Sequence, residues 1–309
     1  MSQARVTVFG SLNYDFVILG PRLPVPGETV KGDQFLMQTG GKGANQALQA
    51  ARLGARTTMI GAIGEDFMGD AQLSSLAAEG MVVDHVVRVP GQTTGTACIF
   101  VKADGQNAIM IVPGANTTCT RGLLDDARSA FEDCDVFLTQ LETNLDAVGY
   151  AMEKARKAGC RVVLDPAPMG PIPAEYWAMA DLVKPNETEA AYYTGLPVDE
   201  GDIVGWARQA AARLRAMGAP AALITLGAKG CYYSGDEELF VSAFPITAVD
   251  ATAAGDSFAG ALAVAMAEGM PMADALRFAS AAGAVTASKA GAQPSIGRRA
   301  DVETFLAAH

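Results

Sequence analysis

Short apolar segments alternate with segments of helical spacing along most of the chain. Residues 6–10 and 57–62 are mainly apolar and β-branched and predict strands, whereas residues 45–53 and 67–79 repeat apolar side chains every three or four positions and predict helices. Beyond residue 122 the pattern predicts helix 123–131, strand 136–139, helix 145–157, strand 161–164, strand 182–184, helix 187–193, helix 203–217, strand 221–225 and helix 259–267. Because short continuous apolar strands between amphipathic helices are typical of a parallel sheet covered on both faces, we predict a doubly wound α/β domain.

Four extended segments do not fit this alternation. They are residues 14–19, 29–38, 95–102 and 108–112, and we expect a turn at residues 103–106 between the last two. We predict that these segments pair into a small separate sheet that covers the carboxyl ends of the main strands as a lid. The lid would be formed by residues about 14–38 and 94–113 of a single domain that spans residues 1–309. Its apolar face would need a partner, either the substrate or a second subunit.

Charge and composition limit the classes of function. The chain has 34 acidic and 23 basic residues, a net charge of −11, which disfavours nucleic acids and acidic membranes as partners. A nucleotide site must therefore be locally positive, rich in backbone N–H donors, or bridged by Mg²⁺. Five widely spaced cysteines predict reduced thiols, and two histidines are too few for a His-type zinc site or a Ser-His-Asp triad. With neither a signal-peptide pattern nor an apolar run of about 18 residues, we expect a cytoplasmic protein.

The small residues of VDATAAGDSF (249–258) come directly before a predicted helix. Unpaired backbone N–H groups and the helix dipole make such a position an anion site. A carboxylate there, Asp256, suits a general base for a hydroxyl that attacks a phosphoryl group. A helix N-cap or first-turn acid would also explain Asp256, but it would not account for Asp250 or for the run of small residues.

Two polar segments near the N-terminus suit a polyol. In GGKGANQ (40–46), glycines allow close approach of a ligand, and Lys42, Asn45 and Gln46 look like hydroxyl binders, although a simple glycine turn is an alternative. Asn13 and Asp15 follow the first strand, where ligands of α/β sheets usually bind, or they form an Asx turn. The chain lacks the P-loop spacing and a full GxGxxG, which argues against a dinucleotide-dependent dehydrogenase.

The segment KPNETE (184–189) ends a strand and begins a helix. Asn186 is a good N-cap and Glu189 stands in the capping-box position, which is a sufficient structural account. The same two side chains could also hold a hydrated Mg²⁺.

These segments, in this order, resemble the ribokinase-like members of the PfkB-type carbohydrate kinase family. The shared motifs are GSLNYD, PVPGETV, GGKGANQA, PGAN (113–116), QLE (140–142), PNETEA, TLGAKG, AVDATAAGDSFAGAL and GAQPS, and they cover nearly the whole chain. The resemblance implies a Rossmann-like αβα sandwich with a mainly parallel sheet and a β-sheet lid that often forms a homodimer. It also implies ATP-dependent phosphorylation of a sugar, with D-ribose first among the candidates.

The resemblance also implies roles for individual residues. The general base would be Asp256, and the backbone N–H groups of Ala253, Ala254 and Gly255 would form an anion hole. The sugar contacts would be Asn13, Asp15, Gly41, Lys42, Gly43, Asn45 and Glu142. ATP would contact Asn186, Thr225, Gly227, Gly230, Gly255 and Ser280. Mg²⁺ would lie near Asn186 and Glu189. An activating K⁺ would be held by Asp250, Thr252, Thr286, Lys289, Gly291 and Ser295.

Two positions depart from the commonest family pattern. Ala253 stands where glycine is common, although ribokinase-like sequences share the alanine, and Tyr14 stands where a small residue is usual. A Tyr14 ring inside the pocket would change the choice of sugar. The resemblance also leaves neighbouring kinases of the family as alternatives, with fructose, deoxyribose, a sugar acid or a nucleoside as substrate, and a non-catalytic sugar or nucleotide sensor is an alternative function.

Overall fold

The computed structural model describes residues 3–102 and 106–309, and its core is a nine-stranded sheet. The strand order is β13-β12-β11-β10-β9-β8-β1-β4-β5. Neighbouring strands are parallel from β5 to β11, whereas β12 and β13 extend the sheet antiparallel. The strands are β1 (Arg5–Phe9), β4 (Arg56–Gly64), β5 (Val82–Val89), β8 (Val136–Thr139), β9 (Arg161–Leu164), β10 (Leu182–Val183), β11 (Ala222–Thr225), β12 (Cys231–Ser234) and β13 (Glu238–Val241).

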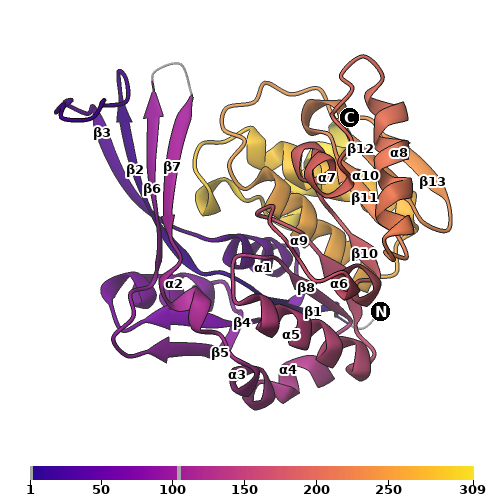
Figure 1. The fold of residues 1–309 in the computed structure, drawn as a ribbon, viewed down its shortest axis with the longest axis horizontal. Helices are drawn as coiled ribbons and strands as arrows, with labels where there is room; N and C mark the ends of the chain where they lie inside the picture. Colours follow the sequence, from indigo (N-terminus) through magenta and orange to yellow (C-terminus); the bar gives the residue numbers. More distant parts are fainter. Residues whose placement is uncertain (1–2, 103–105) are drawn as a thin grey trace.

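Helices cover both faces of this sheet (Figure 1). They are α1 (Lys42–Arg52), α2 (Phe67–Ala78), α3 (Arg121–Asp126), α4 (Arg128–Glu132), α5 (Leu145–Ala158), α6 (Glu175–Met179), α7 (Glu187–Thr194), α8 (Ile203–Ala216), α9 (Ala254–Ala267), α10 (Met272–Ala287) and α11 (Arg299–Ala308). Successive side chains of β8 enter opposite cores: Leu138 packs with residues of α1, α9 and α10, and Phe137 with residues of α5 and α8. The predicted αβα architecture is confirmed.

A second sheet stands at one end of the body, as Figure 1 shows. Its strands are β2 (Asn13–Gly20), β3 (Gln34–Gly40), β6 (Gly95–Lys102) and β7 (Asn107–Val112), in the order β3-β2-β6-β7. Strands β2 and β6 are parallel and pair Asn13 with Gly95, so two segments far apart in sequence meet as expected. The predicted turn at 103–106 lies largely outside the described residues.

Several element boundaries differ from the prediction. Strand β5 was missed and residues 29–33 are not strand, while the helix expected at 123–131 is divided at Ala127. Helix α9 begins at Ala254 rather than 259, because Ala253 takes the left-handed conformation (φ 61°) and turns the chain into the helix there. No helix in the described parts of the chain has both the length and the apolar character to cross a bilayer.

Candidate active site

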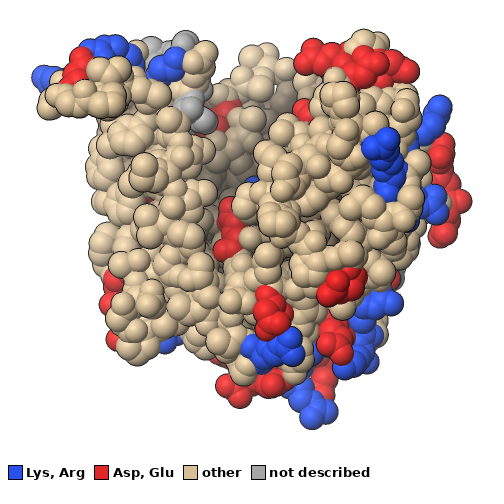
Figure 2. Space-filling model, viewed as in Figure 1, with Lys and Arg blue, Asp and Glu red and all other residues tan. Residues whose placement is uncertain are grey.

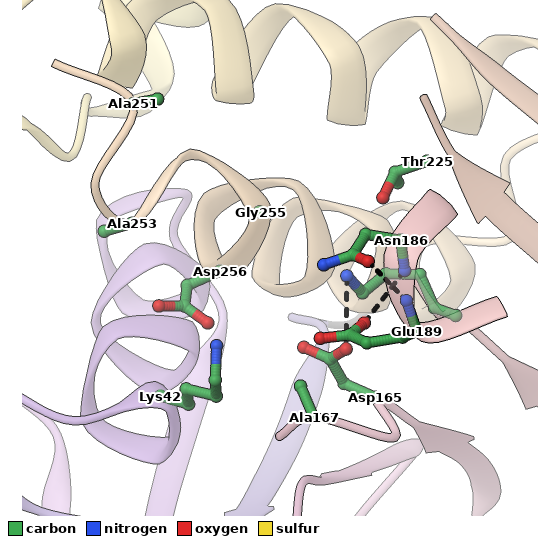
Figure 3. A pocket seen from close by; sticks show the side chains of 11 residues that line it. Lys42, Asp165, Ala167, Asn186, Glu189, Thr225, Ala251, Ala253, Gly255 and Asp256 are labelled. Atoms are coloured by element: carbon green, nitrogen blue, oxygen red, sulfur yellow. Dashed lines mark hydrogen bonds and ion pairs between the residues drawn. The ribbon is translucent and has the colours of Figure 1, made fainter. Parts of the chain in front are cut away.

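A cavity of about 220 Å³ opens beside the start of α9 (Figure 3). Its walls come from α1, from the segments that follow β9 and β10, and from the end of β11. The lining residues are Lys42, Asp165, Ala167, Lys184, Asn186, Glu189, Thr225, Ala251, Ala253, Gly255 and Asp256. Because the carboxyl ends of parallel strands meet at one edge of a sheet, polar residues from separate segments of the chain converge here.

Asp256 is buried in the first turn of α9 and is held by two amide side chains. Asn45 Nδ2 donates to its Oδ2 (2.9 Å), and Gln46 Nε2 donates to its Oδ1 (3.0 Å). The side chain does not cap the helix, so the N-cap part of the alternative is wrong, whereas its first-turn part is correct. Lys42 points toward Asp256 (Figure 3), and the negative charge of Asp256 raises the pKa of Lys42 although burial lowers it.

The first turn of α9 leaves backbone donors at the cavity. The Ala254 N–H donates to the Ala251 carbonyl oxygen (3.2 Å), and the Ser257 N–H donates to that of Ala253 (2.8 Å). The N–H groups of Gly255 and Asp256 have no acceptor among the described residues. A Cβ at Gly255 would meet no atom within 4 Å, so this backbone is open to a ligand.

A second cavity of about 330 Å³ lies between the small sheet and the body. It is lined by Asn13, Ile111, Pro113, Asn116, Thr117, Leu141, Glu142, Thr143 and Pro168. Figure 2 shows the surface hollowed between these two parts of the molecule. Asn13 Oδ1 accepts a hydrogen bond from Asn116 Nδ2 (2.8 Å), and Glu142 Oε2 accepts one from Ser11 Oγ (2.5 Å) and a longer one from the Lys42 N–H (3.4 Å).

The carboxyl groups of Asp15 and Glu142, which come from separate segments of the chain, both have raised pKa values. Burial raises the pKa of Asp15 to about 7, and the charges of Glu142 and Asp256 add to the effect. Burial also raises the pKa of Glu142, although Lys42 opposes this. In the described part of the chain, the Asp15 carboxylate has no hydrogen-bond or ion-pair partner. A ligand that donates hydrogen bonds would therefore be favoured beside Asp15.

Gly41 and Gly43 have a packing role. Gly41 has a φ of 93°, and a Cβ there would lie 2.7 Å from the Asn13 nitrogen. A Cβ at Gly43 would lie 2.6 Å from the Gly10 carbonyl carbon. Both glycines let the start of α1 lie directly against the connection between β1 and β2.

The far end of the first cavity is built by the start of α7. Asn186 and Glu189 form the predicted capping box: Asn186 Oδ1 accepts from the Glu189 N–H (2.8 Å), and Glu189 Oε2 accepts from the Asn186 N–H (2.9 Å). Asn186 also bridges to Thr225. Burial, and then the negative charge of Asp165, raise the pKa of Glu189. A cation beside Glu189 would stabilise its ionised carboxylate and so oppose both of these increases in pKa.

Three predicted nucleotide contacts lie beyond the lining of this cavity. Gly227 and Gly230 belong to the turn between β11 and β12, with φ values of 54° and 115°. At Gly230 a side chain has no room, because a Cβ would lie 2.0 Å from the Val241 carbonyl oxygen. Ser280 lies on α10 beside Cys231 of β12.

The loops before α9 and after α10 are in contact. The Asp250 carboxylate accepts from the backbone N–H groups of Thr252 and Gly291 (both 2.9 Å). Thr286 Oγ1 donates to Ser257 Oγ (2.8 Å), and Ser295 Oγ donates to the Ala292 carbonyl oxygen (2.7 Å). The Lys289 N–H donates to the Thr286 carbonyl oxygen (3.1 Å).

Sequence reasoning missed the buried ion pair of the cavity. Lys184 Nζ lies 3.3 Å from Asp165 Oδ1, and each side chain is 4% exposed. Both residues directly follow short buried strands, β9 and β10, which is the signal that could have identified them. Their pairing depends on those strands being neighbours, which the local pattern does not reveal.

The structure answers two questions that the sequence raised, on the role of Gln46 and on the position of the Tyr14 ring. Gln46 is fully buried and its amide is bound to protein groups, so its interpretation as a hydroxyl binder is wrong. The Tyr14 ring packs edge-on against Phe16 and Phe67 (centroids 5.6 and 5.8 Å) and lines neither cavity, because successive residues of a strand face opposite sides.

Comparisons with known proteins agree with this geometry. Residues 3–298 match the family model for the pfkB family carbohydrate kinases. A ribokinase of Haemophilus influenzae is 39% identical over 303 residues, covering 97% of this chain and 98% of that protein. A deoxyribokinase of Salmonella typhi is 36% identical over 260 residues, covering 84% of each. The structure of Arabidopsis thaliana ribokinase complexed with ribose and ATP superposes with a TM-score of 0.91 at 35% identity, covering 99% of each chain.

Proposed function

Because the chain belongs to the pfkB family of carbohydrate kinases, we propose that it is an ATP-dependent ribokinase, which converts D-ribose and ATP to D-ribose 5-phosphate and ADP. One observation carries the proposal. A carboxylate, Asp256, is held by two amides next to the unpaired N–H groups at the start of α9, and both face one cavity. The relatives named ribokinase, and the one bound to ribose and ATP, support ribose as the sugar.

In this proposal, Asp256 accepts the proton of the primary hydroxyl as that oxygen attacks the γ-phosphorus in line. The backbone N–H groups of Ala253 and Gly255, together with Lys42, stabilise the charge that develops on the transferring oxygens. The Ala254 N–H, also expected in this anion hole, donates to the Ala251 carbonyl oxygen (3.2 Å) in the ligand-free chain and would have to exchange that partner for a phosphate oxygen. Asn13, Asp15, Asn45 and Glu142 orient the sugar, with Gly41 and Gly43 keeping the start of α1 close to it. Asn45 Oδ1 is buried without a hydrogen-bond partner, which suits a sugar hydroxyl as donor.

ATP would extend from the start of α9 toward Asn186, Thr225, Gly227, Gly230 and Ser280. Glu189 is a suitable ligand for Mg²⁺. Its Oε1 takes no part in the capping box, and a cation would stabilise its buried negative charge. No group of three or more acidic, Cys or His side chains in the described residues forms a metal cage, which suits an ion that keeps waters and phosphate oxygens as ligands. Mg²⁺ would neutralise charge on the phosphates during transfer.

The K⁺ site would be formed by the loops that Asp250 joins. Asp250, Thr252, Thr286, Lys289, Gly291 and Ser295 supply a carboxylate, hydroxyls and backbone carbonyls, the hard oxygen donors that an alkali cation prefers. The contact of Asp250 with the Gly291 N–H connects this site to the loop entering α9. A cytoplasmic location remains a prediction from the sequence.

A homodimer through the small sheet is part of the proposal. Apolar side chains of β3 and β7 are exposed, among them Phe35 (55%), Met37 (53%) and Met110 (72%). Figure 2 shows few charged side chains over this sheet except near its tip. A continuous apolar surface of this kind favours burial against a second copy.

The test is a coupled ADP-release assay over a panel of sugars. We expect D-ribose to give the highest kcat/KM, and Asp256→Asn to lower kcat by about 10²–10⁴-fold while ATP still binds. A variant that keeps most of its turnover would remove Asp256 from the role of base.

Deoxyribose is the second candidate substrate, because the Salmonella typhi relative is a deoxyribokinase. A higher kcat/KM for deoxyribose than for ribose would replace the first assignment and leave the phosphoryl-transfer mechanism in place. Absence of turnover with every sugar would favour the sensor alternative.

A further inference from the structure

Gln46 connects the two buried carboxylates of the first cavity. It lies near the start of α1 and is 0% exposed. Its Nε2 donates to Asp165 Oδ2 (2.8 Å) and to Asp256 Oδ1 (3.0 Å). The single NH₂ group therefore uses both of its hydrogens on two carboxylates.

Gln140, in the segment after β8, determines which way the Gln46 amide faces. Gln140 Nε2 donates to Gln46 Oε1 (2.6 Å). With the amide reversed, the Gln46 carbonyl oxygen would face two carboxylate oxygens, and its NH₂ would face the NH₂ of Gln140. Neither arrangement can form a hydrogen bond, so the surroundings define a single orientation.

Asp165, the other acceptor, is itself fixed. Its Oδ1 pairs with Lys184 Nζ while its Oδ2 receives the Gln46 hydrogen bond. Gln46 thus joins Asp256 to the buried ion pair at the ends of β9 and β10. These strands belong to the central sheet, which makes the attachment rigid.

We propose that Gln46 is a positioning residue for the phosphoryl transfer, with Gln140 supporting it; the inference rests on the proposed function. Asn45 holds one oxygen of Asp256 and Gln46 holds the other, so the plane of the carboxylate is defined at two points. Without Gln46, Asp256 is held at one oxygen and can rotate. Because a misplacement of about 1 Å can lower a rate about 100-fold, the loss acts on kcat more than on affinity.

The chain contains a matched control on the same helix. Gln49 is also 0% exposed and also uses its Nε2, which donates to the Gly297 carbonyl oxygen (3.1 Å). It makes no hydrogen bond to Asp165 or Asp256. A Gln→Met change at either position removes a buried amide of the same size from the same helix, but only the change at 46 releases Asp256.

The experiment compares Gln46→Met with Gln49→Met in kcat, in KM for sugar and ATP, and in Tm. We expect Gln46→Met to lower kcat by about 10- to 100-fold with both KM values within about threefold of wild type. Gln49→Met should lower Tm similarly but keep kcat within about twofold. If Gln46→Met does not fold, Gln46→Asn withdraws the same NH₂ by one methylene and should show the same selective loss.

Equal kcat losses in the two variants, or a Gln46 variant with wild-type kcat, would overturn the inference. Asp256→Asn measured in parallel separates the two hypotheses. If Asp256→Asn remains active, the proposed mechanism fails. If it is inactive while the Gln46 variants are fully active, only the positioning role fails.

Discussion

Asp15 makes a specific contribution to the pH dependence of stability. Asp15 is 7% exposed and its carboxylate has no partner among the described residues, so burial raises its pKa from 3.8 to about 7. The folded protein therefore binds this proton more tightly than the unfolded chain does. The contribution of Asp15 to the free energy of unfolding falls as the pH rises from about 4 through about 7.

The magnitude follows from the shift. A rise from 3.8 to about 7 corresponds to an upper limit of about 4 kcal/mol at high pH, at about 1.4 kcal/mol per pKa unit. Roughly half of this loss of free energy occurs between about pH 5.5 and about pH 8.5. Over this interval we therefore expect the free energy of unfolding of the wild type to fall by about 2 kcal/mol more than that of Asp15→Asn.

The assay is urea unfolding of the ligand-free protein at several pH values. Asp33→Asn is the matched control, since it makes the same chemical change at an exposed position just before β3. Asp33→Asn should follow the wild type, whereas Asp15→Asn should be more stable than wild type at high pH. Parallel pH dependence of the wild type and Asp15→Asn would refute the argument from burial.

Three further outcomes are expected. Ala253→Gly should raise the free energy of unfolding by about 0.5–1 kcal/mol, because Ala253 holds a φ of 61° that glycine adopts without strain; a loss in urea unfolding would contradict this. Met110→Glu should shift sedimentation toward the monomer if the apolar sheet forms a dimer, while the exposed Tyr192→Glu on α7 should leave it unchanged; identical profiles would count against that interface. Glu189→Gln should raise the Mg²⁺ concentration needed for half-maximal activity several-fold while helix α7 keeps its Asn186 cap, and unchanged Mg²⁺ dependence would exclude Glu189 from the ion's surroundings.

Local pattern was sufficient for most of the fold. Strands β1, β8 and β9, which contain Val8, Leu138 and Val163, were predicted because each is short, apolar and buried on both faces. Strand β5 was missed because its exposed and half-buried positions include Asp84, His85 and Arg88, as suits the edge of a sheet. The glycine turn of residues 225–230 is evident in the sequence, but the two antiparallel strands that follow it, β12 and β13, were not predicted.

The sequence by itself determined most of the order of elements, the motifs at the strand ends and the family, because periodicity and short motifs are properties of neighbouring residues. Only the tertiary structure decided that Gln46 joins Asp165 to Asp256, that Lys184 pairs with Asp165, and that the Tyr14 ring lies away from the cavities. The physical reason is that these contacts depend on which strands are neighbours in the sheet and on which face of a strand a side chain emerges. The residues next to a side chain in the sequence do not specify which distant group it will contact in the folded protein.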